Sequence, residues 1–468
     1  MSLLDEVGRD LLAAVLARAL RHGGDFAEVF LEDRDGVGVQ LEDGRVERVS
    51  GGRERGAAVR LLVGERTFHA YSDTLDEAGL LAAAAAVAEA ARASRAAPAA
   101  VVALGPVRSD PGRHPVAVPP DTVALADKVR LVRAADEAAR AVSGEVVQAT
   151  VGYGDSRQEV VVANSEGDLV HDVRTRLRLS AQVVARRGDV VQTGHETLGG
   201  SAGFELVDEA AAEGVARAAA AKAVTMLDAR PAPAGTMPVV LANGFGGTLF
   251  HEACGHGLEA DAVAKGASVY AGRLGRQVAA TVVSAYDDGS LTNGWGSQAF
   301  DDEGVPTRKT LLIEKGRLTG YLYDRLRARQ LGATPTGNGR RQSYRHIPIP
   351  RMTTTYIAPG DADPEDIIAA TRRGFYARSL AGGQVEPATG NFVFGVAEGY
   401  LIENGRVTAP LRGATLVGNG IEVLMGIDMV GNDFEVKTGM CGKDGQAVPV
   451  GTGQATLRVA AMTVGGTA

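Results

Sequence analysis

The stretch "GGTLFHEACGHGLEAD", residues 246–261, begins like the metallopeptidase motif H-E-x-x-H, because His251 is followed directly by Glu252. The second histidine, His256, comes one residue later than that motif places it. In a regular α-helix four steps leave two side chains about 40° apart, and five steps leave them about 140° apart. A regular helix would therefore point His251 and His256 in different directions.

Two distortions would bring the histidines back together. A π-bulge, with its i→i+5 hydrogen bond, returns positions five apart to one face of a helix. Alternatively, Gly255 ends the helix and His256 approaches from a C-terminal turn. Gly255 and Gly257 flank the second histidine and permit either distortion. The preceding "NGFGGT" resembles a phosphate-binding loop but lacks Gly-Lys-Ser/Thr, so it indicates close backbone packing between a strand and a helix.

Two histidines do not complete a catalytic zinc site, which needs three protein ligands and an open position. On its own, the motif could simply be a polar turn. Glu259 is close in sequence but is expected on the wrong side of any bulge. Cys254 lies inside the motif and is expected to face away from a metal held by its neighbours. The candidates for the third ligand are Glu259, Asp261, His346 and Cys441.

The composition of the chain restricts the cellular compartment and the binding partners that we expect. The 468 residues include only two cysteines and carry a formal net charge of −8. This excludes a disulfide framework, and the acidic balance opposes binding to nucleic acid or anionic lipid. The N-terminus is acidic where a signal peptide is basic, and the Ala-rich run near 80–91 is too short to cross a bilayer. We expect a soluble, cytoplasmic protein without membrane contact.

The pattern of strands and helices predicts an α+β fold in two domains. Residues 1–228 predict an N-terminal α/β domain of antiparallel strands with flanking helices, interrupted by a long loop over 96–120. The proline-rich "DARPAPAGTMP", residues 228–238, marks the boundary. Residues 239–468 predict a mostly antiparallel β domain that carries the metal-binding helix. The predicted helices include the N-terminal twenty residues, a helix with Thr74 and Glu77 in capping-box register, and segments near 123–142, 207–228, 364–374 and 419–427.

Three blocks carry a resemblance to a known family. Together with residues 246–261, "GNGRRQSYRHIPIPRM" (337–352) and "GMCGKDGQAVPVGTGQATL" (439–457) resemble the signature blocks of the TldD/PmbA metallopeptidases. The chain is most similar to the TldD-type catalytic subunit, because the PmbA (TldE) paralogue lacks H-E-x-x-x-H.

The resemblance implies a site and an assembly. It implies a zinc peptidase with His251, His256 and Cys441 as metal ligands and Glu252 as catalytic base. It also implies a heterodimer with a PmbA/TldE-type partner, with a homodimer as the alternative, that encloses the site and admits only unfolded peptide. The family roles are trimming of leader peptides and degradation of small unstable proteins, and an older name refers to gyrase modulation. Endopeptidase and exopeptidase action both remain open.

The block at 337–351 is rich in cations for an acidic protein. Arg340 and Arg341 are candidates for a clamp on a substrate carbonyl or C-terminal carboxylate, because guanidinium matches carboxylate geometry. Tyr344 and His346 are candidates for oxyanion donors. The alternative is internal ion pairing that shapes the loop.

A competing function is a non-catalytic peptide-binding subunit with a structural metal. Structural zinc sites have four protein ligands, whereas three good candidates occur here, which favours catalysis. The acidic composition opposes a nucleic-acid-binding function.

Overall fold

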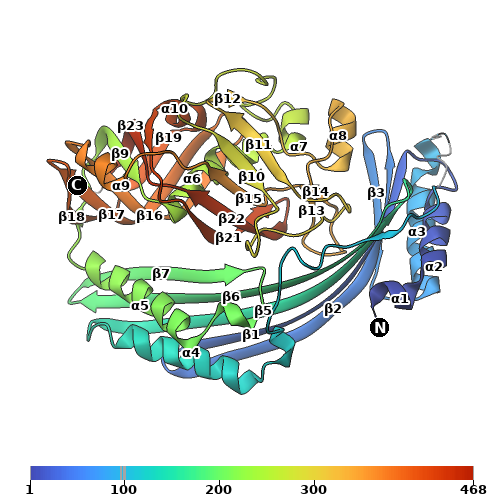
Figure 1. The fold of residues 1–468 in the computed structure, drawn as a ribbon, viewed down its shortest axis with the longest axis horizontal. Helices are drawn as coiled ribbons and strands as arrows, with labels where there is room; N and C mark the ends of the chain where they lie inside the picture. Colours follow the sequence, from blue (N-terminus) through green and yellow to red (C-terminus); the bar gives the residue numbers. More distant parts are fainter. Residues whose placement is uncertain (1, 95–96, 98–101, 467–468) are drawn as a thin grey trace.

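A long, curved, seven-stranded sheet forms one layer of the protein, and it is built from the N-terminal half of the chain (Figure 1). The computed structural model describes residues 2–94, 97 and 102–466. The order of strands is β3-β2-β1-β5-β6-β4, with β7 paired to β6. The strands are β1 (Phe26–Glu42), β2 (Arg45–Val63), β3 (Arg66–Ser72), β4 (Val107–Arg108), β5 (Val146–Asn164), β6 (Leu169–Arg187) and β7 (Val190–Gly200).

Two-residue turns set the register of a hairpin in each half of the chain. Asp43 and Gly44, with φ of 49° and 74°, join β1 to β2 as the tight hairpin that Asp-Gly predicts. Asn404 and Gly405, with φ of 51° and 71°, do the same in the C-terminal half. Both hairpins are of the kind that Asp-Gly and Asn-Gly between two strands predict.

Two groups of helices cover the two ends of this sheet (Figure 1). Leucine, valine and alanine side chains fill a separate core under each group. The first group is α1 (Leu3–Val7), α2 (Arg9–Ala19) and α3 (Glu77–Ala91), and the second is α4 (Leu125–Arg140) and α5 (Glu209–Met226). None of the helices formed by the described residues is long and apolar enough to cross a membrane.

Two details of the predicted helices are wrong. The N-terminal segment forms two helices instead of one, because Gly8 adopts φ 76°, ψ 152° between them. The N-cap of α3 is Asp76, whose side chain accepts a hydrogen bond of 2.7 Å from the backbone N–H of Gly79, and not Thr74. A carboxylate placed directly before the first turn satisfies a free backbone donor, so the capping role moves to Asp76. Among the described residues of the predicted loop over 96–120, only β4 and the first residue of a 3-10 turn are regular structure, whereas residues 96 and 98–101 lie outside the described part.

The C-terminal half forms two further sheets that pack around one large core. Most strand pairs are antiparallel, and together with the helices they confirm the α+β class. The eight-stranded sheet contains β8 (Arg230–Pro231), β9 (Gly235–Leu241), β16 (Arg373–Glu386), β17 (Asn391–Glu403), β18 (Arg406–Arg412), β19 (Thr415–Asn419), β20 (Ile427–Val430) and β23 (Leu457–Gly465). The six-stranded sheet contains β10 (Ala285–Asp288), β11 (Lys309–Glu314), β12 (Arg317–Leu318), β15 (Thr354–Ile357), β21 (Glu435–Lys443) and β22 (Gln446–Gln454).

The remaining C-terminal elements are short. They are α6 (Gly247–Phe250), α7 (Ala260–Ala264), α8 (Arg325–Leu331), α9 (Pro364–Ala369), α10 (Gly420–Met425), and the pair β13 (Gly339–Arg340) and β14 (Ile349–Pro350). The helices α9 and α10 confirm the two predicted near 364–374 and 419–427.

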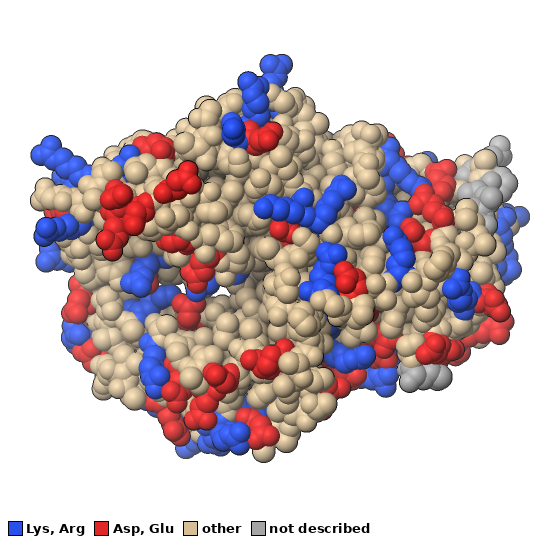
Figure 2. Space-filling view, viewed as in Figure 1, with Lys and Arg blue, Asp and Glu red and all other residues tan. Residues whose placement is uncertain are grey.

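Buried ion pairs join the two layers. Arg60 of β2 binds Glu28 of its own sheet and Glu303 of the C-terminal half, and all three side chains are fully buried. Arg341 also binds Glu28, and Arg174 binds Asp302 at 2.5 Å. Figure 2 shows the surface hollowed between the layers, with basic and acidic side chains at the rim. The boundary at 228–238 and the division into 1–228 and 239–468 stay predictions.

We expect Arg60→Ala to lower the free energy of unfolding by about 3–5 kcal/mol, because it removes the ion pair of the buried Glu303 and one of the two ion pairs of Glu28. The matched control is Arg53→Ala on the same strand, whose side chain is 57% exposed and pairs with Asp33. The control should change stability little. Urea unfolding followed by circular dichroism measures both. Equal stability of the two variants would contradict the importance of the buried network.

Candidate metal centre

A single π-turn brings the two histidines together. The turn spans His251–Gly255, directly after α6, and the backbone N–H of His256 donates to the carbonyl of His251. The imidazole centroids of His251 and His256 are 5.3 Å apart, and their planes are nearly perpendicular at 85°. Of the two predicted distortions, the π-bulge is confirmed. A 3-10 turn over His256–Leu258 follows, so the helical segment also ends shortly after the second histidine.

Close packing explains the glycines of the motif. A Cβ on Gly255 would lie 2.1 Å from Met352 Sδ, and a Cβ on Gly247 would lie 2.6 Å from the backbone nitrogen of Gly453. Real Cβ atoms do not approach other atoms so closely, so larger residues would push the turn away from the strands beneath it. The predicted close backbone packing before the histidines is confirmed.

Cys441 completes a cluster of three ligand atoms. It lies on β21, opposite Val448 of β22. The ligand atoms of His251, His256 and Cys441 all lie within 4.8 Å of one another, and Cys441 Sγ is 3.3 Å from His256 Nε2. Of the four sequence candidates for the third ligand, only Cys441 belongs to this cluster. Cys441 lies 185 positions from His256, and in the sequence only the resemblance to the TldD/PmbA family joined the two residues.

Each histidine is oriented through its second ring nitrogen. His251 Nδ1 is 2.9 Å from Thr355 Oγ1, and His256 Nδ1 is 2.9 Å from Glu259 Oε2. Lys443 Nζ in turn donates to Glu259 Oε2 at 2.9 Å. Such partners fix the tautomer of a ligating histidine and leave Nε2 free for the metal. Glu259 thus orients His256 and does not belong to the cluster of three ligand atoms.

Sequence reasoning missed Thr355 and Lys443. Lys443 follows Cys441 by two positions, so the period of a strand would have placed both side chains on one face. Thr355 has no such signal, because it comes from β15, a strand without any motif of its own.

The protonation states of the cluster favour binding of a metal cation. Burial opposes charge on Cys441, but hydrogen bonds from His251 and His256 outweigh it and lower the pKa of the thiol to about 5. Burial likewise opposes charge on Glu259, yet Lys443 and His256 hold its pKa at about 2. Burial lowers the pKa of His256, but Glu259 and Cys441 raise it to about 11, so a cation would displace a proton on binding.

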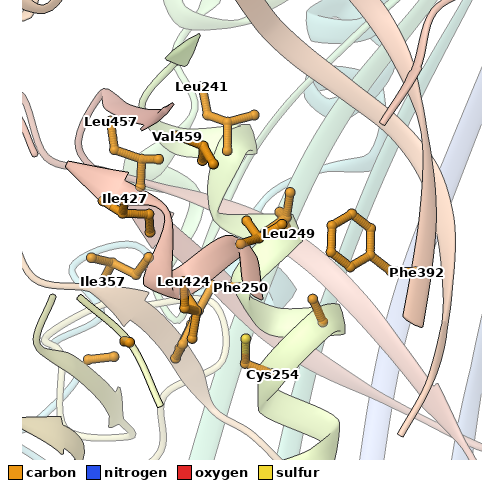
Figure 3. Packing of buried hydrophobic residues seen from close by; sticks show 14 of the residues in the cluster. Leu241, Leu249, Phe250, Cys254, Ile357, Phe392, Leu424, Ile427, Leu457 and Val459 are labelled. Carbon is orange, nitrogen blue, oxygen red and sulfur yellow. The ribbon is translucent and has the colours of Figure 1, made fainter. Parts of the chain in front are cut away.

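Cys254 occupies a different environment. Its side chain is fully buried in the C-terminal core, and Figure 3 shows it near Phe250 and Leu249. Burial raises the pKa of the thiol to about 12. The two cysteines, although both unpaired, are therefore opposite in character.

Glu252 lies beside the cluster without belonging to it. Its Oε2 is 3.6 Å from His256 Nε2, the nitrogen that faces Cys441, and its side chain is 28% exposed. A partly exposed carboxylate at this distance can exchange protons with a water or substrate at the centre.

None of the four predicted substrate residues belongs to the cluster of ligand atoms. Arg341 binds Glu28, and the hydroxyl of Tyr344 donates to Asp73 at 2.5 Å, contacts that match the alternative of internal pairing. His346 Nδ1 is 3.0 Å from Ser343 Oγ. Arg340 donates to two backbone carbonyls and lines a cavity next to β21. Substrate contact by these four residues stays a prediction.

Family models of the PmbA/TldA metallopeptidases match the chain in three consecutive parts. These are domain 1 over residues 27–94, the central domain over 118–227 and the C-terminal domain over 234–466. The chain belongs to the PmbA/TldD family of metallopeptidases. The resemblance predicted from the three signature blocks is confirmed.

Relatives of this PmbA/TldD chain match it over nearly its whole length. The Haemophilus influenzae protein named Metalloprotease TldD homolog is 39% identical, over 95% of this chain and 93% of its own. A Methanothermobacter thermautotrophicus protein named Metalloprotease is 35% identical, over 99% of this chain and 100% of its own. The crystal structure of Thermococcus kodakarensis TldE shares the fold, with a TM-score of 0.77, 21% identity and coverage of 97% of this chain and 99% of that one. The chain is a metalloprotease of the PmbA/TldD family.

We expect Cys441→Ala to lose bound metal and Cys254→Ala to keep it, because only the first removes a ligand atom. The second variant is the matched control, since it deletes a buried thiol of the same domain. Metal content after loading and dialysis is measured by inductively coupled plasma mass spectrometry, with thermal unfolding to check folding. The opposite pattern would show that the ligand assignment is wrong.

Proposed function

We propose that this chain is the catalytic subunit of a zinc peptidase that hydrolyses unfolded peptides together with a PmbA/TldE-type partner. The observation that carries this proposal is the cluster of His251, His256 and Cys441 with Glu252 beside it. The family supplies the reaction class, and the cluster supplies the residues.

The donor set fits zinc. Two imidazole nitrogens and one thiolate are ligands that zinc accepts in catalytic sites. Bonds of about 2.3 Å to sulfur and about 2.0–2.1 Å to nitrogen at a tetrahedral angle separate the two ligand atoms by about 3.5 Å. The 3.3 Å between Cys441 Sγ and His256 Nε2 agrees with that separation. Hard cations such as calcium and magnesium prefer oxygen ligands, which the three-residue cluster does not offer.

Zinc held by these ligands would polarise the scissile carbonyl and lower the pKa of a bound water. The chain contributes the movement of protons. The Glu252 carboxylate accepts a proton from the attacking water and later donates it to the nitrogen of the leaving amine. Glu259 and Thr355 hold the two imidazoles in the orientation that the reaction needs.

A non-catalytic subunit with a structural metal is the alternative. A structural zinc needs four protein ligands, and the cluster found among the described residues has three. A carboxylate that is partly exposed beside the cluster also favours catalysis, since a structural site has no use for a mobile proton acceptor.

An extended substrate is supported by the topology around Cys441. The ligand-bearing strand β21 is the last in the order of the six-stranded sheet. An extended peptide can bind to the edge of a sheet through main-chain hydrogen bonds that require little sequence. A paralogous partner that covers the centre would exclude folded proteins. The proposal includes a cytoplasmic location, where the free thiols of Cys254 and Cys441 stay reduced.

We expect Glu252→Gln to keep its metal and to lower kcat for a disordered peptide by about 10²–10⁴-fold, the usual contribution of a general base. The matched control is Glu314→Gln on β11, an exposed position of the same domain. The assay combines metal content with peptide cleavage in the presence of the partner. Full activity of a metal-loaded Glu252→Gln variant would rule out the assigned role.

We expect cleavage of a segment presented as a free peptide and no cleavage of the same segment inside a stable fold. The physical reason is that only an extended backbone can reach an enclosed centre. The measurement compares both forms by mass spectrometry in the presence of a PmbA-type partner. Equal cleavage of the two forms would mean that the centre is open to folded proteins.

A further inference from the structure

Arginines line a cavity of about 410 Å³ between the seven-stranded sheet and the hairpin of β21 and β22. Alternate residues of β6 point to one face of the sheet, so Arg174, Arg176 and Arg178 enter the cavity together. Met440 and Val448 of the hairpin line it from the other side. We call this space the arginine cavity.

Positive charge exceeds negative charge in the arginine cavity. Its lining contains six arginines and two aspartates. Both aspartates are already paired, Asp302 with Arg174 at 2.5 Å and Asp155 with Lys128 at 2.5 Å. Arg341 pairs with Glu28. Within the described residues, no carboxylate forms an ion pair with the other four arginines of the lining, which are Arg34, Arg176, Arg178 and Arg340.

Arg176 is the least compensated of these side chains. It is only 9% exposed, and its one side-chain hydrogen bond is a long contact of 3.4 Å from Nη2 to Gln298 Oε1. Its Nε, together with Gln298 Nε2 and Arg340 Nε, is buried without an acceptor among the described residues. Burial, together with the nearby charges of Arg174 and Arg340, lowers the pKa of Arg176 to about 9.

A buried cation without a counter-ion is costly, and it persists where a ligand supplies the missing charge. The unsatisfied groups are all donors, so the ligand that matches them is an acceptor with negative charge. Guanidinium groups bind carboxylates through two parallel hydrogen bonds. The arginine cavity is therefore suited to a carboxylate.

The arginine cavity and the metal centre share one hairpin, that of β21 and β22. Met440 and Val448 line the cavity, Met440 precedes Cys441 on β21, and Val448 is the cross-strand partner of Cys441. Successive side chains of a strand point to opposite faces, so a peptide of a few residues would pass from one site to the other around the outer edge of β21.

We propose that the arginine cavity binds a carboxylate of the peptide substrate, with Arg176 as its principal ligand. This proposal rests on the peptidase function proposed above. The carboxylate is either the C-terminus of the peptide or an acidic side chain a few residues from the cleaved bond. The cavity would thereby give a protease with loose sequence preference a fixed register on its substrate.

Trp295 provides a direct test, because it is the only tryptophan of the chain and it lines the arginine cavity. Its fluorescence is titrated in the full-length chain with three peptides: N-acetyl-tetraalanine with a free C-terminus, its C-terminal amide, and N-acetyl-Ala-Asp-Ala-amide. We expect a saturable response to at least one of the two carboxylate peptides and at least tenfold weaker binding of the neutral amide. The responding peptide identifies the source of the carboxylate. Equal responses to all three peptides, or no response to any, would overturn the proposal.

Variants of β6 assign the effect to Arg176. Arg176→Gln should weaken binding of the carboxylate peptide about tenfold and leave binding of the amide unchanged. Arg186→Gln is the matched control, since Arg186 is exposed on the same strand and outside the cavity. Equal affinity of the two variants for the carboxylate peptide would contradict the assignment. If Arg176→Gln does not fold, Arg178→Gln is tested instead. The comparison of the three peptides on the unaltered chain still tests whether the arginine cavity binds a carboxylate.

The titration separates this proposal from the peptidase function. It needs neither metal nor catalysis, and it can be run on the Glu252→Gln variant. Carboxylate-dependent binding, combined with no cleavage by the unaltered, metal-loaded chain in the presence of its partner, would contradict the peptidase alone. Cleavage without any preference for carboxylate peptides would contradict the arginine cavity alone.

Discussion

The hydrogen bond from the backbone N–H of His256 to the carbonyl of His251 is the interaction on which the metal centre depends. This i→i+5 hydrogen bond adds one residue to the helical turn, so two side chains five positions apart lie on the same face of the helix. The same turn directs Cys254 into the core, while Glu252 stays beside the ligands. A distortion of this kind is stable only where the surrounding structure holds it, and here Gly255 lets the turn lie directly on Met352.

A second set of interactions holds Cys441 close to the π-turn. Lys443, on the same strand as Cys441, donates to Glu259 and to Asp261, both of which follow the π-turn. Arg351 donates to the carbonyl of Cys441 from the other side. These contacts hold the hairpin against the histidines, so Cys441 meets His256 although 185 positions, most of the C-terminal half, separate them in sequence. Glu259 is central to this arrangement, because it accepts hydrogen bonds from both a ligand and the lysine.

The N-terminal layer contributes more than support. Its buried ion pairs with the C-terminal half fix the space between the layers, and part of that space is the arginine cavity. A peptidase that accepts unfolded chains gains little from side-chain pockets, but it needs to hold a backbone at a defined position. A charged group near the metal centre would hold the peptide backbone at that position through one contact. The match of relatives over the full chain agrees with a layer that is part of the working unit.

The sequence by itself determined the class of fold, the hairpins at Asp43-Gly44 and Asn404-Gly405, and the identity of the motif around His251. These features depend on neighbours in the chain: the period of apolar residues, the turn preferences of Asp-Gly and Asn-Gly, and the spacing of two histidines. The sequence also limited the distortion of the helix to two forms but could not choose between them. Only the tertiary structure decided that a π-turn forms, that Glu259 contacts Nδ1 of His256, and that the arginines of β6 face the hairpin of Cys441. The reason is that each of these depends on contacts between residues far apart in the chain, where local propensity carries no information.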